Sequence, residues 1–188
     1  MLTHPVLIDQ QSRPSRRERR GERRRLKQLD ALSARLAELH AIDALLEQSR
    51  DVVNAGWIQG AWFSVASASG QRAVVAYDLR TVMDRPVTGA CLVGAVVQAA
   101  GGPATVRSQL VQRTLDLTWH ALREDPVRPV HWSPGPRIRM MQLLELTHWN
   151  DTPGRTREEV VDLLRAGQRT AEVQRGLCRE RQLVLAAP

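Results

Sequence analysis

The fold of this chain is decided by the stretch from Leu26 to Val53, LKQLDALSARLAELHAIDALLEQSRDVV. Its large apolar residues recur at steps of three and four, which places them along one stripe of a helix. They are Leu26, Leu29, Leu32, Leu36, Leu39, Ile42 and Leu46. The helical composition extends back to Arg16, which Ser15 can cap, and Asn54 to Gly56 end the helix. At about 1.5 Å per residue such a helix is roughly 50 Å long or more, so its first part is predicted to project from the body.

The charge of the protein is concentrated just before this stripe. Between residues 13 and 27 there are nine basic residues against two acids, Glu18 and Glu22, an excess that equals the formal net charge of +7. The basic residues are Arg13, Arg16, Arg17, Arg19, Arg20, Arg23, Arg24, Arg25 and Lys27. Because a local cluster produces a field that salt does not average away, this arm is expected to contact nucleic acid, or alternatively an acidic protein surface or anionic lipid.

Two short segments and a helix of small residues are predicted to follow the long helix. Residues 57–66 and 72–77 have mixed β character and favour a hairpin. Thr88 can cap a helix through residue 100, in which Gly94 and its small neighbours allow backbone to pack close to backbone.

Three further helices are expected in the second half. The first spans residues 104–123, with a buried stripe of Val111, Leu115, Trp119 and Leu122. A proline-rich loop at 125–136, which carries Trp132, separates it from a second helix at 138–149, whose apolar residues surround most of its circumference and predict a central position. The third starts at a capping box, Thr156 with Glu159, and continues irregularly to Cys178.

These elements predict a mainly α protein: a compact helical domain with a short β-hairpin and a long, protruding basic helix. We expect a basic arm at residues 1–27, flexible and then helical, a single domain at 28–182 and a tail at 183–188. No apolar stretch approaches the ~20 residues that span a bilayer, and the first eight residues are too short for a signal peptide, so a cytoplasmic protein is expected. Cys91 and Cys178 are expected to be unpaired.

Three pieces of the chain resemble an uncharacterised family of small actinobacterial and phage proteins of unknown function. The most specific is the signature from Trp149 to Leu164, WNDTPGRTREEVVDLL; the others are GWIQG at 56–60 and GACLVGA at 89–95. The resemblance covers roughly residues 44–166 and leaves out the basic arm. It implies a mostly helical domain and an actinobacterial or phage setting, and it implies no activity.

The signature has two interpretations. In the first it is a helix corner, in which Asn150 and Asp151 form a turn and Thr156 opens the next helix. In the second it is a polar site at a helix N-terminus, built from His148, Asn150, Asp151, Arg155 and Thr156.

The sequence also allows a catalytic alternative: Cys91 as nucleophile of a small hydrolase or transferase, with His148 or His120 as base and Asp151 or Asn150 orienting it. The five histidines show no metal-ligand spacing, so neither a metal nor another cofactor is expected. We therefore expect a non-enzymatic binding or accessory protein, with nucleic acid as the favoured partner and no specific catalytic residue. A protein–protein adaptor, or a homodimer through the leucine stripe, is the remaining alternative.

Overall fold

A computed structural model describes residues 15–68, 70–76, 78, 85–132 and 135–187. Its first element is a single long helix, α1 (Arg16–Ala55), as the sequence predicts. A capping box formed by Ser15 and Glu18 starts the helix, and Gly56 ends it. The predicted leader before Ser15, with Arg13 in it, lies outside the described residues.

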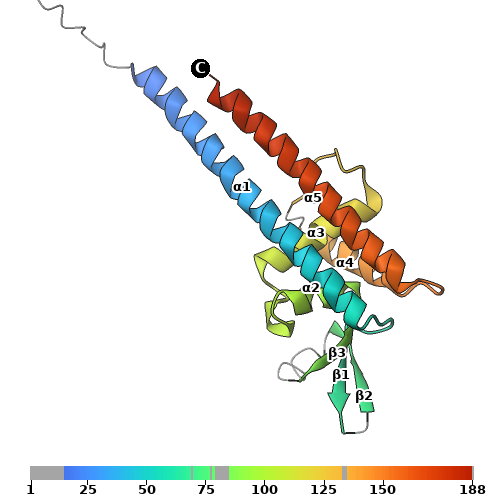
Figure 1. The fold of residues 1–188 in the computed structure, drawn as a ribbon. Coiled ribbons are helices and arrows are strands. Elements are labelled where there is room, and N and C mark those ends of the chain that lie inside the picture. The colour runs from blue at the N-terminus through green and yellow to red at the C-terminus, as the bar shows by residue number, and fades with distance from the viewer. Residues whose placement is uncertain (1–14, 69, 77, 79–84, 133–134, 188) are drawn as a thin grey trace, which may run out of the picture.

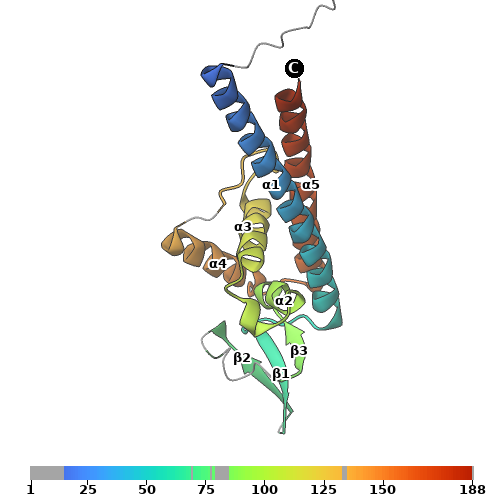
Figure 2. The same cartoon turned by 90° about the vertical axis from the view of Figure 1, so that its left-hand side faces the viewer.

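The last helix, α5 (Arg157–Ala186), lies beside α1 and runs antiparallel to it over much of its length (Figures 1 and 2). The predicted stripe faces this partner: Leu39, Ile42 and Leu46 are fully buried, and Leu46 contacts α5 at Gly167. α5 is longer than expected, because it stays helical past Cys178, and its last turn includes residues 183–186, which the sequence assigned to a tail. None of the described helices is long and apolar enough to cross a membrane.

A three-stranded antiparallel sheet lies at the end of the body where α1 ends (Figure 1). β1 (Phe63–Ser67) pairs with β2 (Gly70–Val74), which confirms the predicted hairpin. The other edge of β1 pairs with β3 (Val87–Ala90), in the order β2-β1-β3. The prediction that Thr88 caps a helix is wrong: Thr88 lies in β3, and its hydroxyl donates to the Ser64 carbonyl, 3.1 Å away. Strand pairing with β1 therefore outweighs the local capping preference of this threonine.

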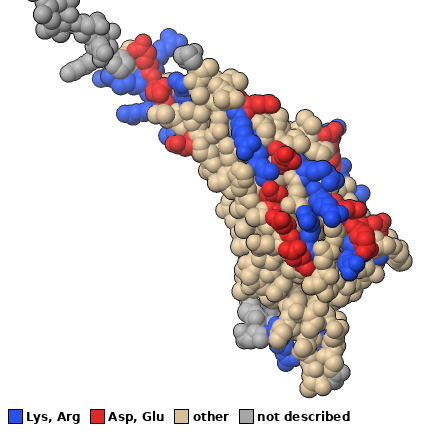
Figure 3. Space-filling view, in the orientation of Figure 1, with Lys and Arg blue, Asp and Glu red and all other residues tan. Residues whose placement is uncertain are grey.

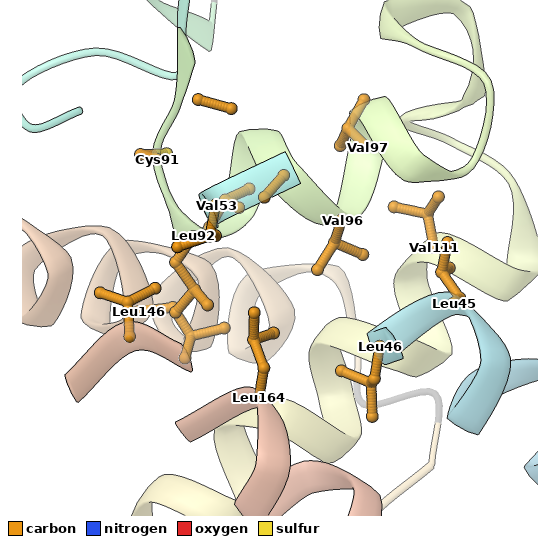
Figure 4. Close-up of a cluster of buried hydrophobic side chains, with 14 of the residues drawn as sticks. Leu45, Leu46, Val53, Cys91, Leu92, Val96, Val97, Val111, Leu146 and Leu164 are labelled. Atoms are coloured by element: carbon orange, nitrogen blue, oxygen red, sulfur yellow. The ribbon is translucent and has the colours of Figure 1, made fainter. Parts of the chain in front are cut away.

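A single residue, Cys91, separates β3 from helix α2 (Leu92–Ala99), which runs through the centre of the molecule. All of its first six residues are buried. Leu92 and Val96 point towards Leu146 and Leu164 from two other helices (Figure 4). The predicted close backbone packing is present at Gly94, where an added Cβ would lie 2.0 Å from the Trp62 carbonyl oxygen.

Helix α3 (Gln109–Arg123) begins five residues later than predicted, because a short 3-10 helix, η2 (Pro103–Thr105), precedes it and Ser108 is its N-cap. Of the predicted stripe only Val111 is fully buried. The other three residues of that stripe are half-buried. Because α3 contacts α1, α2, α4 and α5, its buried residues are spread over more than one face of the helix.

Helix α4 (Pro136–Asn150) is not central, which corrects the prediction for residues 138–149. It lies at the side of the body (Figure 2) and buries only Gln142, Leu146 and Asn150. Four of its large apolar side chains are more than half exposed: Ile138, Met140, Met141 and Leu144. An apolar circumference in this sequence therefore does not mean burial on every side.

Candidate functional site

The basic arm keeps the helical register of α1, and this register separates its charges. With about 100° between successive residues, seven basic side chains fall on an arc of about 160°. They are Arg16, Arg17, Arg19, Arg20, Arg23, Arg24 and Lys27, all exposed. Glu18 and Glu22 fall on the opposite side of the helix. The arm therefore presents one cationic face, and its acids do not interrupt that face.

Arg25 is the one described basic residue of the arm that does not lie on this cationic face, because it faces α5. Its guanidinium donates to the carbonyl oxygens of Leu185, through Nε, and of Ala186, at 2.9 Å through Nη2. These carbonyls belong to the last turn of α5, whose acceptors lack partners within the helix. Arg25 thus joins the arm to the end of α5, and residues 16–24 extend past that end as a single helix (Figure 1).

The arm does not fold back onto the acids of the body. Within the described residues, the one salt bridge that involves a base of the arm joins Arg25 to Glu22, one turn away on the same helix, at 3.7 Å. Figure 3 shows basic side chains gathered at the free end of α1, whereas basic and acidic side chains alternate over the body. The described part of the arm holds eight bases and two acids, so most of the formal net charge of the protein lies at its projecting tip.

The polar cluster predicted at the family signature is centred on Asn150, which is fully buried. Its Oδ1 accepts from Trp57 Nε1 at 2.9 Å and from the backbone N–H of Leu92 at 3.0 Å. Its Nδ2 donates to the Ile58 carbonyl at 3.2 Å and to Asp151 Oδ1 at 2.8 Å. Both acceptor positions and both donor hydrogens of the amide are used. We call these five residues, with Gln59 and Gly60, the Asn150 junction.

The neighbours of Asn150 complete this junction. Asp151 Oδ1 also accepts from the backbone N–H of Gly60 at 3.0 Å, and Gln59 Nε2 donates to the Asn150 carbonyl at 2.8 Å. The junction therefore joins the end of α4 to the loop after α1 and to the first turn of α2. The three sequence pieces that carry the family resemblance meet at this point.

Arg155 and Thr156 hold the turn that follows the junction. The Arg155 guanidinium lies 4.0 Å from the centre of the Trp149 ring and donates to the Trp149 carbonyl at 3.0 Å. Thr156 caps α5 through the predicted box with Glu159. His148 lies on the exposed side of α4, beside Met141 and Leu144. These contacts correspond to the helix-corner interpretation, because the polar groups of the turn bind one another.

Cys91, the candidate nucleophile, is fully buried and is the N-cap of α2, where its Sγ accepts from the Gly94 N–H at 3.4 Å. Burial raises the pKa of the thiol to about 12, which holds it in the protonated, weakly nucleophilic form. His120 is also buried, which lowers its pKa, and its Nε2 lies 3.1 Å from the Asp125 carbonyl oxygen. Neither environment is typical of an activated nucleophile or its base.

Trp132, which the sequence singled out in the proline-rich loop, is half-buried and packed within the chain. Two guanidinium groups lie over its ring, that of Arg35 at 3.4 Å and that of Arg113 at 5.4 Å from the centre. The same two arginines pair with Glu38. Burial lowers the pKa of Arg35, and the hydrogen bond to Glu38 opposes this shift.

Sequence reasoning did not foresee the ion pair between Asp116 and Arg139, which connects α3 to α4. Arg139 Nη2 and Nε donate to the two Asp116 oxygens at 2.8 and 3.1 Å, and the Asp116 side chain is only 2% exposed. This bonding raises the pKa of Arg139. The one signal in the sequence was an acid placed in the apolar pattern of residues 111–122.

Comparison with known proteins assigns a family to this chain. Residues 37–170 match the Family of unknown function (DUF6197), and the chain belongs to that family. The match includes the Asn150 junction and begins after the basic arm. No curated protein matches the chain. No solved structure matches it either.

Proposed function

We propose that this protein is a non-enzymatic nucleic-acid-binding or accessory protein that contacts the phosphate backbone through its basic arm. The observation that carries the proposal is the arc of seven exposed bases on the first turns of α1, with both acids of the arm on the opposite side. The sequence of the nucleic acid plays little part in such binding, since contacts to phosphates carry no base information.

The dimensions of the arm support this proposal. Residues 16–24 form a single helix beyond the end of α5, and an α-helix of about 10–12 Å diameter fits the roughly 12 Å major groove of B-DNA. The capping box at Ser15 helps the helix to start without support from the body. Neighbouring arginines repel one another, and phosphates relieve this repulsion, so binding is also expected to stabilise the arm.

The test is a charge variant of the full chain, R16Q/R20Q/R23Q/K27Q, measured by fluorescence anisotropy against mixed-sequence DNA and RNA over a range of salt concentrations. Removing four phosphate contacts should weaken binding more than tenfold at low salt. It should also reduce the slope of log K against log salt by about 3 to 4.

A matched control removes the same number of charges from exposed arginines of the body, as R128Q/R157Q/R165Q/R169Q. This variant has the same net charge as the arm variant, so a smaller loss of affinity identifies the arm as the contact. Equal losses in the two variants, or unchanged binding in the arm variant, would contradict the proposal.

A homodimer is a second candidate, and one observation favours it. Leu26, Leu183 and Val184, near the open end of the α1–α5 pair, are 50%, 72% and 76% exposed. A second copy would remove this apolar surface from water. Sedimentation of the wild type and of L183E/V184E checks this: we expect a concentration-dependent dimer that the double variant abolishes, and a wild type that stays monomeric at high concentration would exclude it.

A further inference from the structure

The cationic face of the arm has two edges. About 100° separates successive residues of an α-helix, so Arg19 and Arg23 lie along one edge of the arc, and Arg17 and Arg24 lie along the other. All four side chains are exposed. The outermost arginines of the two edges are roughly 160° apart around the helix, so they point in nearly opposite directions. A ligand that occupies both edges at once must therefore carry anions on both sides of the helix.

The rest of the described chain leaves this face open and also limits its length. Arg25, which donates to the last carbonyls of α5, lies almost opposite the middle of the arc, so α5 stands behind the cationic face. Beyond Lys27 the same side of α1 presents Asp30, which is exposed and would repel a phosphate. The face therefore covers residues 16–27, about 16 Å of helix.

We propose that the arm lies in the major groove of B-form duplex DNA and contacts the phosphates of both strands, one strand from each edge. This inference rests on the proposed function and names the class of nucleic acid. The major groove is about 12 Å wide and admits one α-helix, whereas the minor groove, at about 6 Å, is narrower than a helix. A helix in the major groove has a phosphate backbone on either side, which places anions where both edges point.

Two other nucleic acids fit this surface less well. Duplex RNA has a deep and narrow major groove, which a helix of about 10–12 Å diameter does not enter. Proteins that bind single strands stack the bases on aromatic side chains, and this chain has no Phe, Tyr or Trp before Trp57. The arm therefore offers a single strand only its charges.

The test compares four probes of the same sequence and length, each titrated with the full chain and followed by fluorescence anisotropy at one salt concentration. They are duplex DNA, the same duplex with glucosylated 5-hydroxymethylcytosine in place of cytosine, duplex RNA and single-stranded DNA. The glucose groups fill the major groove and leave the phosphates unchanged. We expect the unmodified duplex DNA to bind about tenfold more tightly than each of the other probes.

Two variants with matched charge test the two edges separately. R19Q/R23Q removes the bases of one edge and R17Q/R24Q those of the other. Each variant should lower the slope of log K against log salt on duplex DNA by about 2, because each loses two phosphate contacts. R165Q/R169Q is the control: it removes two exposed arginines from α5, has the same net charge as either edge variant and should leave the slope nearly unchanged.

Two results would overturn this inference and leave the proposed function standing. One is an unmodified duplex DNA that binds no more tightly than one of the other three probes. The other is a loss of affinity in only one of the two edge variants, which would mean that the arm follows the outside of a single backbone. Unchanged binding in R16Q/R20Q/R23Q/K27Q would contradict the proposed function itself, and this inference with it.

Discussion

The Asn150 junction and the basic arm differ in the surroundings of their polar groups, which are buried and paired at the junction and exposed in the arm. At the junction, every donor and acceptor of the buried Asn150 amide has a partner inside the chain. In the arm, seven bases stand exposed on one face of a helix, and the acids lie on the other. Buried groups must be paired to be stable, whereas exposed charges remain available to a partner. The family match covers the junction and begins after the arm.

The largest effect that separates the two regions is expected from Asn150→Ala. The substitution leaves Trp57 Nε1, the Leu92 N–H and the Ile58 carbonyl buried without their partner. It should lower the free energy of unfolding by about 3 to 5 kcal/mol, measured by urea denaturation. Asn54→Ala is the control, since Asn54 is exposed at the end of α1 and should change stability by less than about 0.5 kcal/mol. If the two variants changed the free energy of unfolding by similar amounts, the junction would not be a main source of the stability of the body.

A glycine-to-alanine pair gives the next largest contrast. Gly94→Ala should destabilise the protein by about 3 kcal/mol, because the new Cβ would lie 2.0 Å from a backbone oxygen. Gly21→Ala in the arm meets nothing within 4 Å, and should favour the helix locally by about 0.5–1 kcal/mol. Urea denaturation measures the loss of stability in Gly94→Ala, and amide exchange of residues 16–24 measures the local stability of the arm in Gly21→Ala. A global loss of stability from Gly21→Ala would show that the arm packs on the body.

The two capping boxes allow a smaller and closely matched comparison. Thr156→Ala should cost about 1 kcal/mol of global stability, because α5 is part of the packed body. Ser15→Ala removes the same type of cap from the projecting end, so it should leave the free energy of unfolding unchanged and only speed amide exchange in the first turn of α1. Equal global effects would contradict an independent arm.

The weakest effect is a pH dependence that the boxes share. Hydrogen bonds from the backbone N–H of Ser15 and of Thr156 lower the pKa of Glu18 and Glu159 below the ordinary 4.5. Because the pKa is lower in the folded state, the contribution of each box is complete above pH 4.5 and is lost as the pH falls through the lowered value. NMR titration should show the first turns of α1 and α5 fraying in that acidic range. Glu18→Gln should remove the effect from α1 alone, and fraying that persists there would contradict this origin.

The sequence predicts the elements that depend on local signals. The stripe from Leu26 to Leu46 and the caps at Ser15 and Thr156 are such signals, and these helix starts are confirmed. The failures involve tertiary context. Thr88 has a good capping side chain, but β1 offers it a strand partner, and α4 is apolar all round, yet it lies at the side of the body.

The candidate site follows the same division. The cationic face of the arm could be predicted from the sequence, because the basic residues lie close together along the chain and a helix alone places them on one face. The sequence identified the three segments that form the junction, but it did not predict that they meet. Their residues Trp57, Leu92 and Asn150 are far apart along the chain. A single sequence does not show which charged residues will pair in space, so the ion pair between Asp116 and Arg139 could not be predicted.

The hydrogen bonds from Arg25 to the last carbonyls of α5 have a practical consequence for handling the protein. They bring the C-terminal end of the described chain next to the arginine-bearing tip, so a purification tag or fluorescent fusion placed there would stand beside the surface that it is meant to report on. A label on β2, in the sheet at the opposite pole of the molecule (Figure 1), would leave that surface unobstructed.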